Sequence, residues 1–99
     1  MTGFEWDSQK ETENIRKHGV DFATALRIWD EPILEREDER RDYGETRILA
    51  FGKVDGRLMA VLYTWRGANR RIISARKANR REQRRFEAEI SSQAQSDTA

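Results

Sequence analysis

The stretch RLMAVLYTWRGANRRIISARK, Arg57–Lys77, decides the fold of this chain. β-Branched, aromatic and aliphatic residues dominate two runs, and turn residues bound them, which predicts strands at Arg57–Trp65 and Arg70–Ala75. The short segment Arg66–Asn69, which contains a glycine, joins these strands. Simple alternation divides the second strand into one face with Arg71, Ile73 and Ala75, and another with Arg70, Ile72, Ser74 and Arg76. Arginines thus lie at the ends of strands whose middle residues are buried, where they can bind an anionic, planar ligand.

The residues before this stretch extend it into a sheet. Thr46–Val54 predicts a further strand, and Asp55-Gly56 suits a type I′ hairpin turn, in which both central residues have positive φ. With the two strands above, this predicts a meander of three antiparallel strands. Ile33–Asp38 is a weakly patterned strand, and the polar residues Asp38–Gly44 form a loop.

The ends of the chain predict helices. Phe4–Trp6 is an edge strand, Asp7 is the N-cap of a helix over Ser8–His18, and Gly19 is its C-cap. Asp21 begins a second helix, whose apolar stripe is Phe22, Ala25, Leu26 and Trp29 and which Pro32 ends. A basic helix begins near Asn79. The expected fold class is α+β, with two N-terminal helices packed on an antiparallel β-sheet and a basic C-terminal helix. Residues 1–90 form one domain and residues 91–99 a flexible tail.

Composition excludes several classes of protein. Ninety-nine residues suffice for one domain. The absence of cysteine excludes disulfides and thiolate metal sites. No apolar run has the length of a membrane span or a signal sequence, so we expect a cytoplasmic protein with no membrane partner.

The net charge of +1 hides a strong separation of charge. Between Asp30 and Glu45 there are eight acidic residues against three arginines, whereas between Arg66 and Arg85 there are nine basic residues against Glu82 alone. Eight of those nine are arginines, the residue suited to bidentate phosphate contacts and base stacking. The pattern indicates a nucleic-acid ligand, although two solvated faces are the alternative.

Four segments together resemble the BrnT family of type II toxins: FEWD at the start, KHGV after the first helix, DYGETR, and the run RIISARKA. The resemblance covers residues 4–87 in order. It implies a small RelE-like α+β domain that arrests growth by cleaving mRNA. It also implies a BrnA-like ribbon-helix-helix antitoxin that binds the operator DNA, and a toxin–antitoxin heterotetramer.

Cleavage of RNA without a metal requires deprotonation of the 2′-hydroxyl, stabilisation of the phosphorane charge and protonation of the leaving 5′-oxygen. Metal-dependent hydrolysis is disfavoured, because the carboxylates cluster in one charged loop and a single histidine cannot supply a typical ligand set. We therefore expect no metal and no cofactor. The candidate catalytic residues are Arg76, Arg71, Lys77, Tyr63, His18 and Glu45, and the candidate RNA-binding residues are Arg47, Arg66, Arg80 and Tyr43.

Several of these candidates have a structural alternative. His18 suits a helix C-terminus, where the macrodipole favours a cation, as well as proton transfer. Tyr63 is either a core residue or an acid–base group whose pKa neighbouring arginines lower. Glu45 is either a general base or the ion-pair partner of an arginine, and Arg71 either binds RNA or pairs with the acidic loop. Lys10, Asn14 and Lys17 form a solvated face or extend the RNA groove.

Two other functions fit the same residues. A non-catalytic module would use the arginines for phosphate contacts alone and would bind with steep salt dependence. An interaction protein would dock its acidic loop and basic helix on partners without any affinity for nucleic acid.

Overall fold

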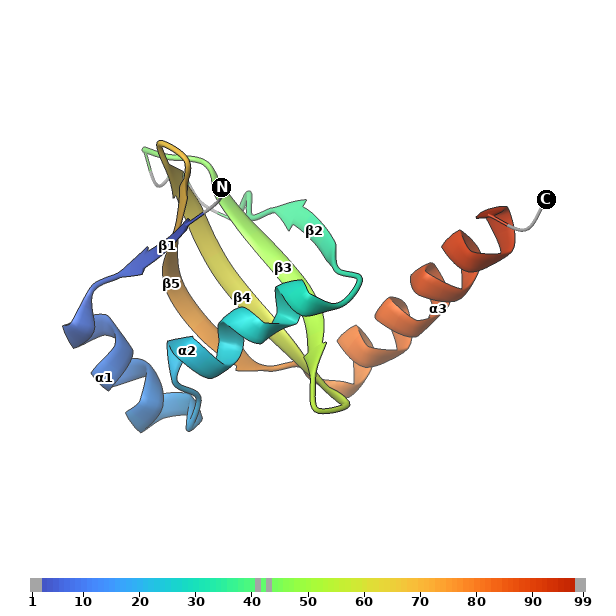
Figure 1. The fold of residues 1–99 in the computed structure, drawn as a ribbon, viewed down its shortest axis with the longest axis horizontal. Helices are drawn as coiled ribbons and strands as arrows, with labels where there is room; N and C mark the ends of the chain where they lie inside the picture. The colour runs from blue at the N-terminus through green and yellow to red at the C-terminus, as the bar shows by residue number, and fades with distance from the viewer. Residues whose placement is uncertain (1–2, 41, 43, 98–99) are drawn as a thin grey trace.

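A five-stranded sheet in the order β1-β5-β4-β3-β2 forms the centre of the computed structural model, which describes residues 3–40, 42 and 44–97 (Figure 1). The elements are β1 (Gly3–Trp6), α1 (Ser8–His18), α2 (Phe22–Ala25), the 3-10 helix η1 (Leu26–Asp30), β2 (Leu34–Glu37), β3 (Arg47–Val54), β4 (Arg57–Arg66), β5 (Asn69–Lys77) and α3 (Arg80–Asp97).

The predicted meander is confirmed, because β3, β4 and β5 pair antiparallel in sequence. Asp55 (φ 51°) and Gly56 (φ 79°) both have the positive φ that a type I′ turn requires. The weak strand at β2 and the edge strand at β1 are also present. However, β1 runs parallel to β5, so the prediction of an antiparallel sheet is wrong at this edge. No turn fixes the direction of β1, since the helices and three strands intervene before β5.

A β-bulge in β5 changes which residues share a face. Tyr63 pairs with Ile72 but its neighbour Leu62 pairs with Ser74, so Ile73 is the extra residue. Ile72 and Ala75 therefore both lie on the buried side of the sheet, at 1% and 0% exposure. The simple alternation predicted from the sequence, which separated these two residues, is wrong for this reason.

The two faces of the sheet are covered unequally. One face of the sheet, which we call the helix face, is covered by the N-terminal helical segment. It carries Met59, Val61, Tyr63, Ile72 and Ala75, which form the main core with Val20, Phe22, Ala25 and Ile28 of that segment. The opposite face, which we call the α3 face, carries Leu58, Ala60, Leu62 and Thr64 of β4. Here a smaller cluster joins Leu58, Ala78 and Phe86, with Leu34, Phe51 and Ile90 packed against it. In Figure 1, α3 then extends away from the sheet.

The predicted caps of α1 are confirmed. The Asp7 carboxylate accepts hydrogen bonds from the backbone N–H groups of Gln9 (2.8 Å) and Lys10 (3.1 Å), and Gly19 ends the helix with φ 69°. The second helix is shorter than its stripe predicted, because α2 changes into η1 at Leu26. A 3-10 helix repeats every three residues, so Ile28, and not Leu26 or Trp29, is fully buried.

The C-terminal helix α3 begins after Asn79, as expected, and the exposed arginines of its first two turns make it basic there. It continues to Asp97, through residues that the sequence assigns to a tail. Residues 91–97 contain neither proline nor glycine, and their glutamines and alanine favour a helix.

Candidate functional site

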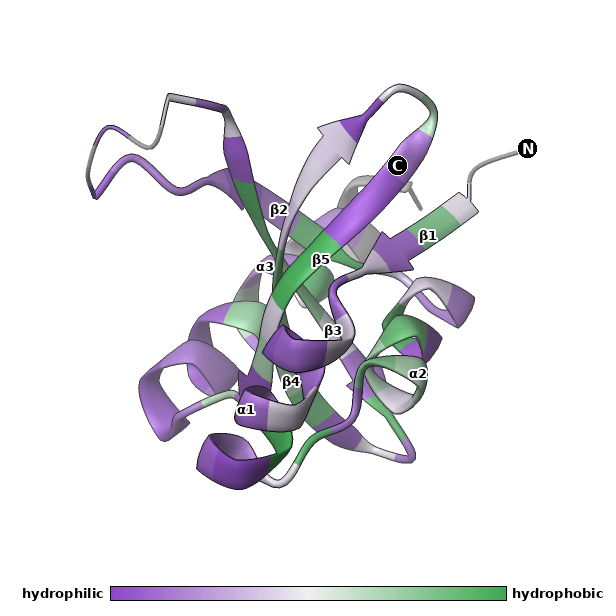
Figure 2. Cartoon of the chain, turned by 90° about the vertical axis from the view of Figure 1, so that its left-hand side faces the viewer, coloured by the Kyte–Doolittle hydropathy of each residue, from purple (hydrophilic) through white to green (hydrophobic). Residues whose placement is uncertain are grey.

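Three predicted arginines meet at one end of the sheet. In the strand register Thr64 pairs with Arg47 on β3 and with Arg71 on β5, so both arginines flank Thr64 on the α3 face. At about 4.8 Å per strand, their backbones are roughly 10 Å apart. Arg66 ends β4 beside them. We call these three arginines, together with Glu5 and Glu45, the arginine rim. In Figure 2 the part of β5 next to the β4–β5 turn is hydrophilic, while its middle is hydrophobic.

Two carboxylates hold the guanidiniums of the arginine rim. Arg71 Nη1 lies 2.8 Å from Glu5 Oε2. On the other side, Glu45 lies 3.1 Å from Arg47 Nε and 3.7 Å from Arg66 Nη2. Arg71 lowers the pKa of Glu5 chiefly through this hydrogen bond, with a second from Asn69, and the charge of Arg66 contributes further. Arg66, which pairs with Glu45, therefore also lies near enough to Glu5 for its charge to act there, which places the two ion-paired groups next to each other.

This arrangement suits an anion that contacts several donors at once. Arg47, Arg66 and Arg71 are partly exposed, at 21%, 57% and 33% of their side-chain surface. Guanidinium groups present planar, bidentate donors that match a phosphate. A phosphate that enters must compete with Glu5 and Glu45, whose two negative charges offset part of the three positive charges of the arginines.

Arg76 lies on the same face but at another place. It pairs with Ala60, four residues along β4 from Thr64, which is about 13 Å at 3.3 Å per residue. Its guanidinium makes a bidentate pair with Glu82, at 2.8 and 2.9 Å, which raises the pKa of Arg76 and lowers that of Glu82. Glu82 also forms a capping box with Asn79, since each side chain accepts from the other's backbone N–H at 2.8–2.9 Å. Arg76 thus joins β5 to the start of α3.

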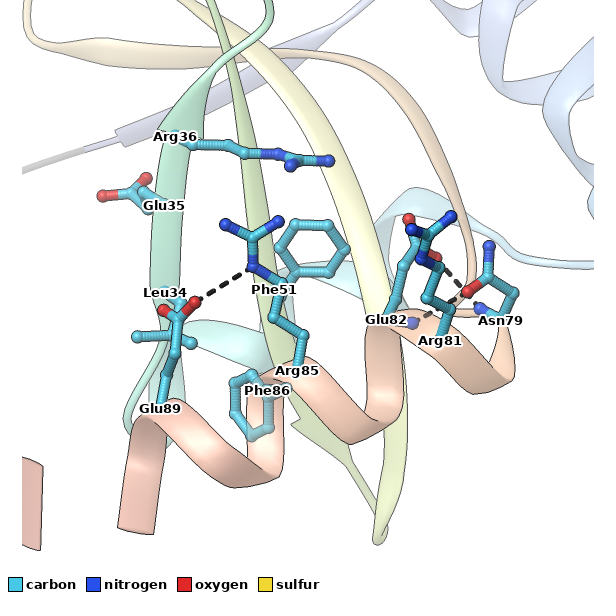
Figure 3. Close-up of a pocket in the computed structure, with 10 residues that line it drawn as sticks. All are labelled: Leu34, Glu35, Arg36, Phe51, Asn79, Arg81, Glu82, Arg85, Phe86 and Glu89. Atoms are coloured by element: carbon cyan, nitrogen blue, oxygen red, sulfur yellow. Dashed lines mark hydrogen bonds and ion pairs between the residues drawn. The ribbon is translucent and has the colours of Figure 1, made fainter. Parts of the chain in front are cut away.

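A groove of about 360 Å³ separates α3 from β2 and β3 (Figure 3). Leu34, Phe51 and Phe86 form its apolar part, and Arg36 lies over the Phe51 ring at 5.6 Å from the centroid. Arg81 and Arg85 line the α3 side, where Arg85 pairs with Glu89 at 3.1 Å. Arg36 was not predicted as a site residue, because only the pairing of β2 with β3 brings it to this face.

The helix face at the rim end of the sheet holds an aromatic cluster around Arg70. The guanidinium carbon of Arg70 lies 4.7 Å from the ring centroid of Trp29, 4.8 Å from Trp65, 5.4 Å from Tyr63 and 5.8 Å from Phe4. The Tyr63 hydroxyl donates a hydrogen bond to Glu35. Burial, and then this carboxylate, raise the pKa of Tyr63. Arg70 lowers the pKa of Tyr63, but by less than burial and Glu35 raise it. The hypothesis that arginines lower this pKa overall is therefore wrong. Tyr63 also lies on the opposite face from Arg71 and Arg76.

The remaining candidates do not join the arginine rim. Lys77 and Arg80 are exposed and lie at and beyond the far end of β5, and the bulge turns Lys77 to the helix face. His18 is exposed at the end of α1, one turn beyond Asn14, which bonds Ala75. Tyr43 lies outside the described residues. Of the expected site, the structure brings together Arg47, Arg66, Arg71 and Glu45, and adds Glu5, which the sequence analysis did not select.

Neither a metal site nor a membrane span is visible in the part of the chain that the structure describes. There, no three His, Asp or Glu side chains are grouped as they would be to hold a metal ion. None of the described helices is sufficiently long and apolar to cross a membrane.

Comparisons with known proteins agree with the resemblance seen in the sequence. The family described as "Ribonuclease toxin, BrnT, of type II toxin-antitoxin system" matches residues 6–82. The crystal structure of the Brucella abortus ribonuclease toxin BrnT superposes with a TM-score of 0.61 at 27% identity, over 81% of this chain and 100% of that one. No curated protein matches the chain. Because the match extends from the last residue of β1 to the start of α3, the chain belongs to the BrnT family of ribonuclease toxins of type II toxin–antitoxin systems.

Proposed function

We propose that this toxin cleaves mRNA by a metal-independent transesterification and that the arginine rim binds the scissile phosphate. The observation that carries the proposal is the convergence of Arg47, Arg66 and Arg71 on two carboxylates at one end of the α3 face. Cationic donors fixed around developing negative charge are often the largest single contribution to catalysis.

In the proposed reaction the 2′-oxygen of the RNA loses its proton and attacks the adjacent phosphorus. The bond from phosphorus to the 5′-oxygen breaks, the 5′-oxygen takes up a proton, and a 2′,3′-cyclic phosphate remains. Glu45, which contacts both Arg47 and Arg66, is the carboxylate that we assign as acceptor of the 2′-hydroxyl proton. Arg76, whose bidentate bond holds it to Glu82, becomes a positioning residue for α3 in this proposal.

The family implies an antitoxin partner. We further propose that this partner is a BrnA-like ribbon-helix-helix protein that forms a heterotetramer with the toxin in the cytoplasm and alone contacts the operator DNA. We also propose that the fold is RelE-like. An inhibitor that covers the arginine rim must offer carboxylates, because it replaces an RNA phosphate there.

The reaction is tested by incubating the purified protein with RNA in excess EDTA and analysing the new ends for 2′,3′-cyclic phosphate. We expect Arg71→Ala and Arg47→Ala each to lower the cleavage rate about 10²–10³-fold, the loss typical of one donor to a developing oxyanion. Arg27→Ala is the matched control. Arg27 forms an exposed bidentate pair with Asp55, at the turn that joins β3 to β4 at the other end of the sheet, so its variant should cleave at the wild-type rate.

Two results would contradict the proposal. Intact RNA with the wild type as well as with the variants, together with salt-dependent binding, would assign the arginine rim to a non-catalytic RNA-binding function. Equal loss of cleavage in Arg27→Ala and Arg71→Ala would show that the rim has no special role.

A further inference from the structure

The arginine rim accounts for phosphate binding but leaves one exposed feature beside it without a role. Trp65 is the residue before Arg66 on β4, and its side chain is on the helix face. It retains 43% of its surface in solvent, although most aromatic residues of the chain lie in or against the two cores. Its inner neighbours are Tyr63, in an edge-to-face contact at 5.7 Å, and the guanidinium of Arg70 at 4.8 Å.

We propose that the exposed indole of Trp65 is a stacking site for one base of single-stranded RNA. The proposal rests on the proposed function, since it names how the same substrate is held. Aromatic side chains bind unpaired bases through their faces, and arginine adjoining the ring adds a cationic contribution.

The surroundings of Trp65 hold the ring in place before any ligand arrives. Phe4 contacts Trp29 at 5.3 Å, Trp29 contacts Tyr63 at 5.6 Å, and Arg70 lies against all three of these rings and Trp65. Within the described residues Arg70 forms no ion pair, and the buried Nε of its guanidinium has no hydrogen-bond partner. The four rings thus surround this side chain and place its positive charge behind Trp65. A ring ordered in this way loses little conformational entropy when a base stacks on it.

The charges on this face favour a base over a phosphate at Trp65. Glu35 is exposed and accepts the hydrogen bond of Tyr63, so a carboxylate adjoins the aromatic cluster and opposes a second negative charge. A phosphate is better placed at Arg66, whose Cα is about 3.8 Å from that of Trp65 and whose side chain reaches Glu45 on the α3 face. One nucleotide can therefore place its base on one side of the hairpin end and its phosphate on the other.

The test measures binding without cleavage. The probe is a fluorescent 2′-O-methyl oligonucleotide, which lacks the attacking hydroxyl, and a second version that lacks the central bases. For the intact oligonucleotide we expect Trp65→Ala to raise Kd by about 5- to 150-fold, which corresponds to the 1–3 kcal/mol typical of one stacked base. Trp65→Phe should keep most of the affinity. The base-free oligonucleotide should bind equally to the wild type and Trp65→Ala.

A matched control and a second variant separate stacking from other effects. Ile15→Ala removes a similarly exposed apolar side chain on α1, 45% exposed, and should leave Kd unchanged. Arg66→Ala should lower the slope of log Kd against log salt by about 0.7, whereas Trp65→Ala should leave the slope unchanged. If Trp65→Ala is poorly folded, Trp65→Leu, which keeps an apolar side chain but no aromatic face, takes its place and should weaken binding of the intact oligonucleotide alone.

Each remaining result counts for or against the stacking site. An unchanged Kd in Trp65→Ala would overturn it, as would an equal loss on both oligonucleotides. Unchanged RNA affinity with loss of antitoxin co-purification would assign Trp65 to the protein partner and also overturn it. A wild type that binds through Trp65 but leaves ordinary RNA intact would keep the stacking site and refute the proposed reaction. Cleavage with no dependence of binding on Trp65 would do the reverse.

Discussion

Replacing Asn14 should unfold this domain at a much lower temperature, because its side chain fastens α1 to the sheet. Asn14 is 5% exposed. Its amide nitrogen donates to the backbone carbonyls of Val20 and Ala75, both at 2.8 Å, and its oxygen accepts from the N–H of Ala75 at 3.0 Å. In Asn14→Ala the two carbonyls and the N–H lose their side-chain partner inside the protein.

Three hydrogen bonds at about 1 kcal/mol each give a loss of about 3 kcal/mol, before any further cost of the unpaired groups. For a domain of this size, 1 kcal/mol shifts Tm by about 4–8 °C, so we expect Tm to fall by roughly 12–24 °C. The measurement is thermal unfolding followed by circular dichroism. Glu13→Ala, at an exposed position of the same helix, should change Tm by only a few degrees.

A second substitution isolates the hydrogen bonds from the change in volume. Asn14→Asp keeps the size but, when ionised, places a carboxylate against two carbonyl oxygens, so at pH 7 it should destabilise at least as much as Asn14→Ala. Lowering the pH should recover part of the loss, because the protonated acid donates one hydrogen bond. A loss below about 0.5 kcal/mol in Asn14→Ala, the range of ordinary surface substitutions, would refute the reasoning.

Three further substitutions test the structure. Glu82→Gln should destabilise by about 1–2 kcal/mol through loss of the ion pair with Arg76, while the Gln oxygen can still accept the capping hydrogen bond from Asn79. Because Arg76 lowers the pKa of Glu82 from 4.5, the difference in stability from wild type should be full at pH 7 and should disappear as pH falls through the lowered pKa. Gly52→Ala should cost about 1–3 kcal/mol in urea unfolding, since a Cβ there would lie 2.8 Å from Ile28 Cβ and 2.9 Å from Ile33 Cγ2; a neutral result would mean that these side chains can move apart. Tyr63→Phe should lower the free energy of unfolding by about 1–2 kcal/mol below pH 10. Since the folded-state pKa of Tyr63 is raised, the wild type should lose stability relative to the variant as pH rises from 10 through that higher value. Parallel curves of unfolding free energy against pH would contradict this.

Local signals were sufficient for most of the elements. The Asp55-Gly56 turn, the caps at Asp7 and Gly19 and the apolar run of β4 each act over a few residues, so the sequence determined the meander and α1. The charge separation likewise indicated a site rich in arginine, and the four family segments identified the ribonuclease toxins.

Long-range pairing decided what the sequence left open. The direction of β1 depends on its contact with β5, and the bulge at Ile73 depends on how β4 and β5 match over their whole length. Asn14 looked like part of a solvated face, because only the packing of α1 on β5 places it beside the carbonyl of Ala75.

The candidate site shows the same division. The arginines were visible in the sequence, but their distances were not, since a sheet register sets Arg47 and Arg71 on either side of Thr64 and leaves Arg76 about 13 Å away. The contacts of Glu5 with Arg71, of Arg36 with Phe51 and of Arg70 with Trp29 all join segments far apart in the sequence. The sequence by itself determined which elements form and that arginine dominates the surface, because propensity, turns and charge are local. Only the tertiary structure decided which arginines act together, because strand pairing joins residues far apart in the chain.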